Sequence, residues 1–169
     1  MSTQPPKLHH VANLTLIPGP PHNAGNTPRG RANWIELSGG SFTTADGQHI
    51  ATVLPGGGDY ATRHAEDNVL EVDLRVVAQD PSGTLFRLKS IGYDYLDDDF
   101  MQVLDGKAPE KPHSGEQAPD IYGFEVVHVN TSSPGYRWMN FSILVGQVQF
   151  VLGEKGVESV EYKLYRVSK

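Results

Sequence analysis

The chain has 169 residues, of which 38% are hydrophobic and 20% charged, as is typical of one folded domain rather than a disordered polymer or a membrane protein. Fourteen Lys and Arg residues against twenty Asp and Glu residues give a net charge of −6, which argues against a nucleic-acid partner. Cysteine is absent, and this excludes disulfide scaffolds, thiolate metal sites and cysteine nucleophiles.

Segments that could enter a membrane are not evident in the sequence. No apolar run approaches the roughly 20 residues needed to span a bilayer. The first ten residues lack the apolar core of a signal peptide. We therefore expect a cytoplasmic protein with no membrane partner.

Eighteen glycines and twelve prolines separate short segments rich in β-branched and aromatic residues, a pattern typical of an all-β domain. It predicts a single domain over residues 1–169, with hairpin turns at residues 79–83 and 153–156. About eight antiparallel strands favour a barrel over residues 8–167, with a sandwich as the alternative. The expected strands are 8–17, 33–37, 48–54, 69–79, 84–93, 122–129, 136–152 and 157–167.

Two stretches interrupt this pattern. Residues 18–31 are rich in Pro, Gly and Asn and predict an irregular crossing loop. Residues 94–120 are acidic, contain prolines and predict a long insert with one helical turn at 98–104. A loop of this length inside a domain is either a functional lid or a mobile decoration, and the sequence leaves both open.

The expected strand 69–79 has two contrasting faces. Leu70, Val72, Leu74, Val76 and Ala78 fall on one face, and Glu71, Asp73 and Arg75 fall on the other. In one interpretation the charged face is simply solvated. In the other it faces a cavity, where Asp73 acts as a base and Arg75 steadies a developing oxyanion.

The expected strand 136–152 also has a mixed face. Tyr136, Trp138, Asn140 and Ser142 share that face, which combines aromatic and hydrogen-bonding groups in the manner of small-molecule pockets. The alternative is that Tyr136 and Trp138 cover the rim of the core.

The segment TVLPGGGDY at residues 52–60 is the most unusual in the chain. Its three glycines permit close approach of another group, or a tight bend at a barrel corner. The lysine and hydroxyl residue of a phosphate-binding P-loop do not follow. Asp59, Tyr60 and His64 form a candidate acid–base cluster at the exit of the loop. The spacing of the seven histidines predicts no metal site.

Several motifs together resemble the DUF3237 family of domains of unknown function. These are WIELSGGSF at 34–42, TVLPGGGDY at 52–60, EVDLR at 71–75, YRWMN at 136–140 and LYRV at 164–167. The resemblance implies a small antiparallel barrel of the calycin-like or allene-oxide-cyclase-like kind, often self-associating. It also implies that these motifs gather around one open end or lumen, and so favours a cavity-facing position for Asp73 and Arg75. It implies no activity.

Three functions from different classes remain open. The first is a cofactor-independent isomerase or cyclase, with loss of water as a variant, that acts on a hydrophobic biosynthetic intermediate in the lumen. Asp73 or Asp59 would move the proton. Its other site residues would be Arg75, Tyr93 and Asn140, which polarise a carbonyl, and Tyr60, Trp138, His64, Glu71 and Tyr136, which contact the substrate. The second is a lipocalin-like carrier, and the third is an assembly module with a filled interior. We expect no cofactor, and a homo-oligomer.

Overall fold

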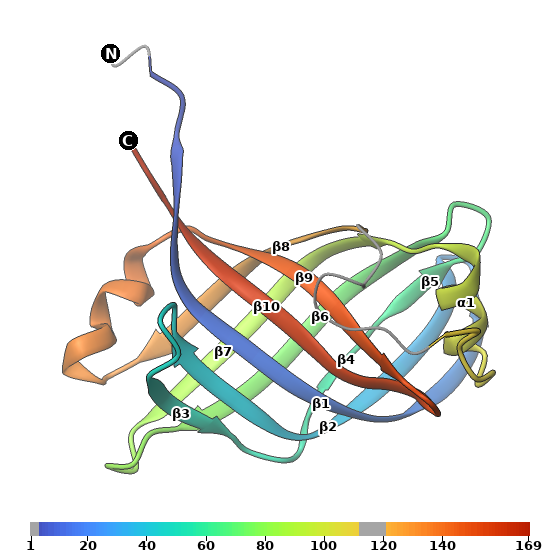
Figure 1. Ribbon diagram of the computed structural model, residues 1–169, viewed down its shortest axis with the longest axis horizontal. Coiled ribbons are helices and arrows are strands. Elements are labelled where there is room, and N and C mark those ends of the chain that lie inside the picture. The colour runs from blue at the N-terminus through green and yellow to red at the C-terminus, as the bar shows by residue number, and fades with distance from the viewer. Residues whose placement is uncertain (1–3, 112–120) are drawn as a thin grey trace.

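In the computed structural model, which describes residues 4–111 and 121–169, ten strands pair into one antiparallel sheet that closes on itself (Figure 1). The elements are β1 (Lys7–Thr27), β2 (Gly30–Thr44), β3 (His49–Val53), β4 (Gly57–Asp59), β5 (Thr62–His64), β6 (Val69–Gln79), β7 (Leu85–Tyr95), helix α1 (Asp98–Leu104), β8 (Tyr122–Thr131), 3-10 helix η2 (Pro134–Phe141), β9 (Leu144–Gly153) and β10 (Gly156–Ser168).

Eight strands form the ring, in the order β1, β10, β9, β8, β7, β6, β3 and β2, and β2 pairs back with β1. The short strands β4 and β5 also pair with both β2 and β6, so β3 to β5 act as one interrupted strand. Lys7 of β1 pairs with Ser168 of β10, which joins the first and last strands. The predicted antiparallel barrel of about eight strands is confirmed.

The interior of the barrel is apolar, as the alternation of β6 shows. Leu70, Val72, Leu74, Val76 and Ala78 are each at most 4% exposed. The charged residues of β6 alternate with them and lie on the outer surface. The expectation that Asp73 and Arg75 face the lumen is therefore wrong. A barrel of eight strands has room inside for side chains or one small ligand, and burying the charges of Asp73 and Arg75 there would be costly.

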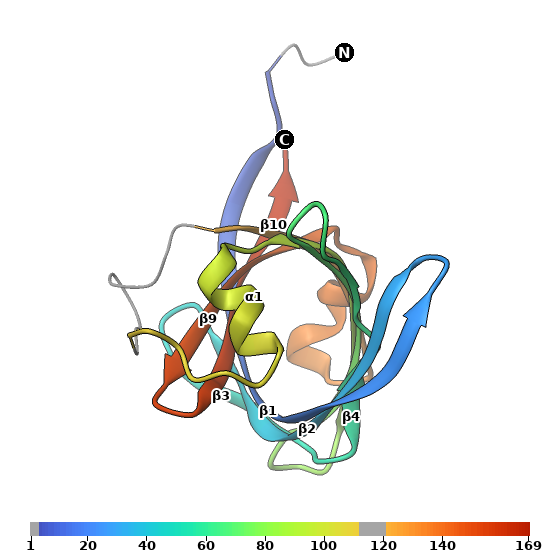
Figure 2. The same cartoon turned by 90° about the vertical axis from the view of Figure 1, so that its right-hand side faces the viewer.

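Helical segments lie at the two ends of the barrel. Figure 1 places α1 at one end and η2 at the other, and Figure 2 shows α1 lying across its end of the ring. The Asp97 carboxylate caps α1 by accepting a hydrogen bond from Phe100 N at 2.7 Å. The predicted helical turn at 98–104 is confirmed, whereas residues 112–120 of the same insert lie outside the described residues. In the described part of the chain, no helix has the length and apolarity to cross a membrane.

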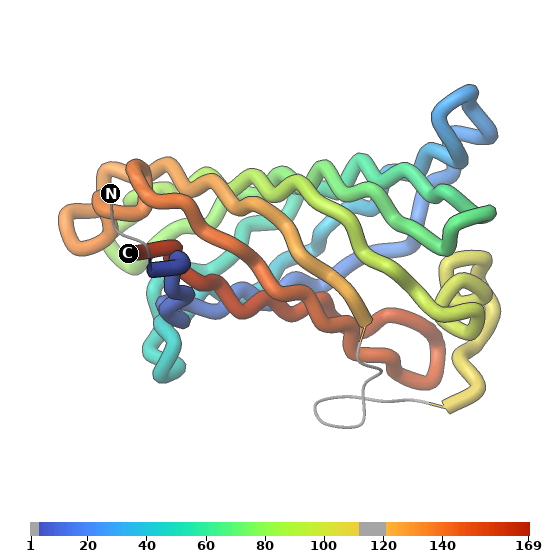
Figure 3. Tube along the Cα trace, turned by 90° about the horizontal axis from the view of Figure 1, so that it is seen from above, coloured from blue at the N-terminus to red at the C-terminus, as the bar shows by residue number. Residues whose placement is uncertain are grey.

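The expected irregular loop at 18–31 is wrong. Residues 18–27 continue β1 and pair with β2 in a long ribbon, which projects beyond the ring in Figures 2 and 3. Proline has no backbone N–H to donate, and the pairing of β1 with β2 shifts register near Pro18 and Pro21, where regular hydrogen bonding is interrupted. From Pro18 onward, β1 pairs with β2 alone, so these prolines lie along an edge where they are tolerated.

The expected strand 136–152 is half wrong. Its first part belongs to η2, which begins at Pro134, and only Leu144–Gly153 forms a strand. Asn140 anchors η2 to the end of β8, because its Oδ1 accepts from Thr131 N at 2.8 Å and its Nδ2 donates to Thr131 O at 2.9 Å. The alternating pattern of these residues therefore does not describe two faces of a strand.

Candidate active site

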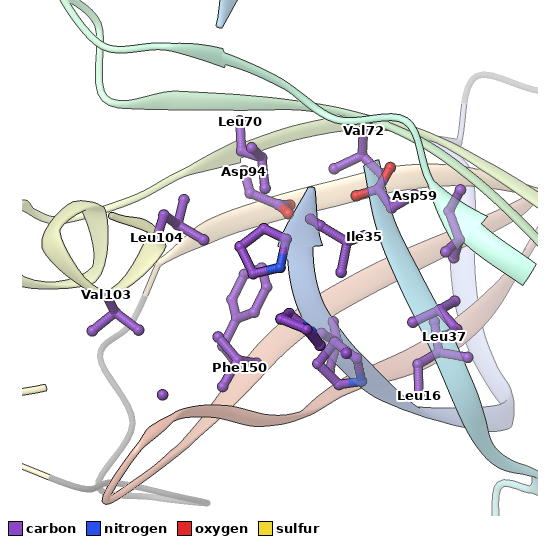
Figure 4. Close-up of a pocket in the computed structure, with 18 of the residues that line it drawn as sticks. Leu16, Ile35, Leu37, Asp59, Leu70, Val72, Asp94, Val103, Leu104 and Phe150 are labelled. Atoms are coloured by element: carbon purple, nitrogen blue, oxygen red, sulfur yellow. The ribbon is translucent and has the colours of Figure 1, made fainter. Parts of the chain in front are cut away.

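A pocket of about 420 Å³ lies inside the barrel at the end covered by α1 (Figure 4). Most of its wall is apolar, contributed by the ring strands and by α1. Its volume lies within the range of roughly 300–1,000 Å³ that is usual for small-molecule sites. Representative wall residues are Leu16, Ile35, Leu37, Val72, Leu104 and Phe150.

Asp59 brings a carboxyl group into this apolar space, as Figure 4 shows. It ends β4, where it pairs with Ile35 of β2 and Leu74 of β6, both of which also line the pocket. The preceding glycines allow this placement. A Cβ on Gly57 would lie 2.7 Å from the carbonyl oxygen of Arg75, so β4 fits between its neighbours only without a side chain there.

The Asp59 carboxyl retains its proton to unusually high pH. Burial raises the pKa of Asp59 to about 7, and the nearby Glu125 carboxyl adds to the rise. One hydrogen bond opposes this effect, because Asp73 N donates to Asp59 Oδ1 at 3.1 Å. Asp59 is therefore poised to give and take a proton near neutral pH.

A second carboxyl, that of Asp94, also points into the pocket (Figure 4). Asp94 lies on the inner face of β7 and is 1% exposed. Burial raises the pKa of Asp94 well above its usual value, and Glu125 and Asp59 raise it further. Its Oδ1 atom is buried without a hydrogen-bond partner among the described residues, so it is free to accept from, or donate to, a bound molecule.

Glu125 interacts with both groups through its charge, lies on the inner face of β8 and is 2% exposed. Burial raises the pKa of Glu125 to about 7. The Tyr162 hydroxyl opposes the rise by donating to Glu125 Oε1 at 3.1 Å and to Oε2 at 3.3 Å. Burial and the neighbouring acids raise the pKa of Tyr162 itself, so its hydroxyl stays a donor.

Together these residues form an acid–base cluster at one side of the apolar pocket, made of Asp59, Asp94, Glu125 and Tyr162. Its three carboxyls titrate as a set, because a charge on one disfavours a charge on the others. Near neutral pH the set holds both protonated and ionised members. A general acid and a general base are thus available within one site.

Of the ten residues that the sequence suggested for the site, only Asp59 lies in this pocket. Asp73 and Arg75 pair with each other on the outer surface, where Arg75 Nη2 donates to Asp73 Oδ2 at 3.0 Å. Hydrogen bonds from Arg75 lower the pKa of Asp73, the reverse of what a base near neutral pH needs. Tyr60 is 58% exposed and lies under the Arg75 guanidinium, which is 5.7 Å from the centre of its ring.

The other predicted contacts are dispersed over the molecule. His64 pairs with Glu71 across β5 and β6, with Nε2 and Oε2 3.1 Å apart, and Tyr93 is 52% exposed on the outer face of β7. Tyr136, Trp138 and Asn140 belong to η2, at the opposite end of the barrel from α1 (Figure 1). Arg75 and Asn140 do share an open groove, but it lies outside the pocket.

Sequence reasoning missed Asp94, Glu125 and Tyr162, although one signal pointed to Asp94. The alternation of 84–93, extended by one residue, places Asp94 on the same face as Phe86 and Leu88. A carboxyl on an otherwise apolar face is a candidate functional group. Among residues 4–111 and 121–169, no three His, Asp or Glu side chains are arranged to hold a metal ion.

The chain is similar to known sequences over nearly its whole length. A family model described as "Protein of unknown function (DUF3237)" matches residues 6–167. PR-toxin biosynthesis cluster protein 7 of Penicillium roqueforti is 28% identical in an alignment of 175 positions that covers 95% of this chain and 92% of that protein.

Solved structures are similar over the full barrel. A β-barrel-like protein from Acinetobacter baumannii has a TM-score of 0.72 at 21% identity, over 99% of each chain. An enzyme from Penicillium herquei has a TM-score of 0.62 at 17% identity, over 99% of this chain and 98% of that one. At these identities the likeness establishes the fold alone.

Proposed function

The chain belongs to the DUF3237 family, whose description names no activity, and we propose that it is a cofactor-independent isomerase or cyclase acting on a hydrophobic small molecule. The observation that carries the proposal is the pair of carboxyls of Asp59 and Asp94, both directed into an apolar pocket and both with raised pKa values. The protein named for the PR-toxin biosynthesis cluster and the enzyme from Penicillium herquei support a biosynthetic substrate.

The reaction needs only proton transfers. A protonated carboxyl gives its proton to a carbonyl, an epoxide or an alkene of the substrate, and an ionised carboxyl takes a proton from a carbon or hydroxyl of the same molecule. The substrate gains one proton and loses one, so an isomer or a ring forms without an oxidant or reductant. Where a hydroxyl is the group protonated, it departs as water and the product is lighter by that amount.

The roles within the cluster follow from its geometry. Asp59, Asp94 and Tyr162 line the pocket and can touch a substrate, whereas Glu125 is not part of its wall. Glu125 acts through charge, because its ionised form raises the pKa of both aspartates. Tyr162 holds the Glu125 carboxylate through its hydroxyl. Glu125 thus has no contact with the substrate and acts by helping Asp59 and Asp94 to keep their protons.

The wall of the pocket favours a neutral and largely apolar substrate. Apart from Lys155, its ionisable residues are Asp59, Asp94 and Tyr162, so a carboxylate or phosphate on the substrate would meet groups of like charge or groups that retain their protons. Val103 and Leu104 of α1 cover the substrate on the side of the barrel end. The rigid wall can hold a flexible molecule in the conformer that reacts, which lowers the entropic part of the barrier.

The test compares a metabolite extract of the source organism before and after incubation with the protein, by liquid chromatography and mass spectrometry. The wild type should convert a feature into a product of equal mass, or of mass lower by one water. Asp59→Asn and Asp94→Asn should lose most of this turnover. The matched control is Asp73→Asn, an outer-surface carboxyl whose loss should leave turnover unchanged.

Two outcomes would contradict the proposal. If Asp59→Asn and Asp94→Asn both turn over substrate as fast as the wild type, the cluster is not the acid–base device. If a feature is retained by the protein and released unchanged on denaturation, the chain is a carrier. A filled interior, as an assembly module requires, does not fit a pocket of about 420 Å³.

A further inference from the structure

Large apolar side chains gather on the outer face of β7 and β8. Among the described residues, twelve large hydrophobic side chains are exposed, and seven of them lie on these two neighbouring strands. Six of the seven form one strip, here called the outer strip, made of Ile91, Tyr93, Tyr95, Tyr122, Phe124 and Val126, with exposed fractions from 38% to 57%. The seventh, Leu85, lies at the opposite end of β7.

The outer strip is continuous, because its members are paired across the two strands. Tyr95 pairs with Tyr122, Tyr93 with Phe124, and Ile91 with Val126. The rings of Tyr95 and Tyr122 lie 5.2 Å apart, and those of Tyr122 and Phe124 lie 5.1 Å apart. Single exposed hydrophobic residues are ordinary, whereas a contiguous patch of this kind marks an interaction surface.

We propose that the outer strip of β7 and β8 is the contact surface between two copies of this chain. β7 and β8 are internal strands of the ring, each with a neighbouring strand on both sides, so neither forms a sheet edge to which a partner strand would add. The second copy therefore packs against the side chains of the outer strip. A face that meets itself about a two-fold axis forms the commonest kind of homodimer.

The exposed apolar area of the outer strip matches what one partner buries in a typical homodimer interface. An aromatic side chain has roughly 150–250 Å² of surface, so six large side chains at these exposures present about 500 Å² together. A stable interface buries about 800 Å² on each partner, and about 65% of a homodimer interface is apolar, which is again about 500 Å². Exposed tyrosine and phenylalanine are also the residue types that such interfaces favour.

The charges around the outer strip also suit a second copy. Glu71 of β6 flanks Tyr93, and Asp73 of β6 and Lys89 of β7 lie beside Ile91 at the other end of the strip. Acidic and basic side chains therefore both border the outer strip, and a second copy of the chain can place an opposite charge against each of them. A partner of uniform charge would face a group of like charge at one end.

The test is the mass of the full chain in solution, measured by light scattering after size exclusion at roughly 1–100 μM. The wild type should show twice its single-chain mass of 18.5 kDa. The double variant Tyr93→Glu, Phe124→Lys should show the single-chain mass. Its opposite charges face each other across the strand pair, which preserves the β-sheet while removing the apolar contact.

The matched control is Phe141→Glu, at the most exposed large hydrophobic residue, which lies in η2 and outside the strip. It should keep the double mass. Circular dichroism checks that each variant is folded. A wild type that stays a single chain at the highest concentration overturns the proposal and assigns the strip to another occupant. A folded double variant that still dimerises overturns it too, because the contact then lies elsewhere.

Discussion

Gly92 of β7 lies directly opposite Glu125 of β8, and a Cβ atom at position 92 would lie 2.7 Å from Cγ of Glu125. Gly123 stands in a similar relation to Asp94, since its Cβ would lie 3.0 Å from Asp94 Oδ1. Each of the two buried carboxyls thus has a glycine across from it. Space for the acid–base cluster is provided by the missing side chains of neighbouring strands.

The first prediction concerns this space. Gly92→Ala should lower the free energy of unfolding by about 1–3 kcal/mol, because the added methyl group overlaps Glu125 in a closed ring that cannot widen. Denaturant unfolding measures the change. The control is Gly135→Ala, where an added Cβ meets nothing within 4 Å. Equal stability of Gly92→Ala and the wild type would show that the strands move apart freely.

The second prediction is that stability falls as the pH rises through the neutral range. Near pH 5 the folded protein holds protons on Asp59 and Glu125, whose pKa values are about 7, while the unfolded chain has released them. Raising the pH therefore favours unfolding. One such group changes the free energy of unfolding by about 3 kcal/mol between roughly pH 5 and pH 8.

Thermal or denaturant unfolding across this pH range measures the slope. Glu125→Gln should flatten it, whereas Glu110→Gln, at an exposed site, should not. The salt-bridged Asp73 and Asp105 have lowered pKa values, so their contribution changes only at more acidic pH. A stability that rises from pH 5 to pH 8 would contradict the assignment of retained protons.

The third prediction concerns the hydrogen bond from Tyr162 to Glu125. Tyr162→Phe removes a donor to the ionised carboxylate, so the pKa of Glu125 should rise above its value of about 7. A hydrogen bond to a charged group contributes about 1.5–3 kcal/mol, which corresponds to an upward shift of roughly one to two pH units. The infrared band of the protonated carboxyl, followed during titration, reports this directly. Tyr165→Phe, at an exposed hydroxyl that donates to Gln147, is the control.

The fourth prediction concerns how α1 is held over the pocket. The Asp105 carboxylate, next to the end of α1, accepts from both Arg31 and Arg63 at 2.7 Å. Asp105→Asn should weaken this contact and speed amide hydrogen exchange in α1 several-fold. Global stability should change by only about 1 kcal/mol, because the ion pairs are partly exposed. Glu110→Gln should leave the exchange unchanged, and equal exchange in both variants would show that α1 is held by its apolar contacts.

The alternation of apolar residues was enough to predict the barrel but not its pocket. The two faces of β6 were separated correctly, since Leu70 and Val72 are buried and Asp73 and Arg75 are exposed. Alternation alone cannot tell which face encloses a cavity. That depends on the closure of the ring, which is set by long-range pairing such as Lys7 with Ser168.

Two segments were misjudged because local composition and tertiary structure disagree there. The prolines at 18–21 indicate a loop, yet the ribbon tolerates them along an edge that needs no donors. The alternation over 136–142 imitates a strand, although Pro134 and the Asn140 side chain hold these residues in a 3-10 helix. Asp94 and Glu125 come together only through the register of β7 and β8.

The pocket wall has two parts that differ in how freely their residues can be substituted. One part lies on the closed sheet, and the other lies on the ribbon of β1 and β2 and on α1. The carboxyls belong to strands of the closed sheet, whereas Pro18, Pro20 and Pro21 line the same pocket from a stretch of β1 that pairs with β2 alone. Leu104 of α1 likewise lies outside the sheet. Substitutions in the ribbon or in α1 can therefore change the shape of the pocket while leaving the carboxyls of Asp59 and Asp94 in place.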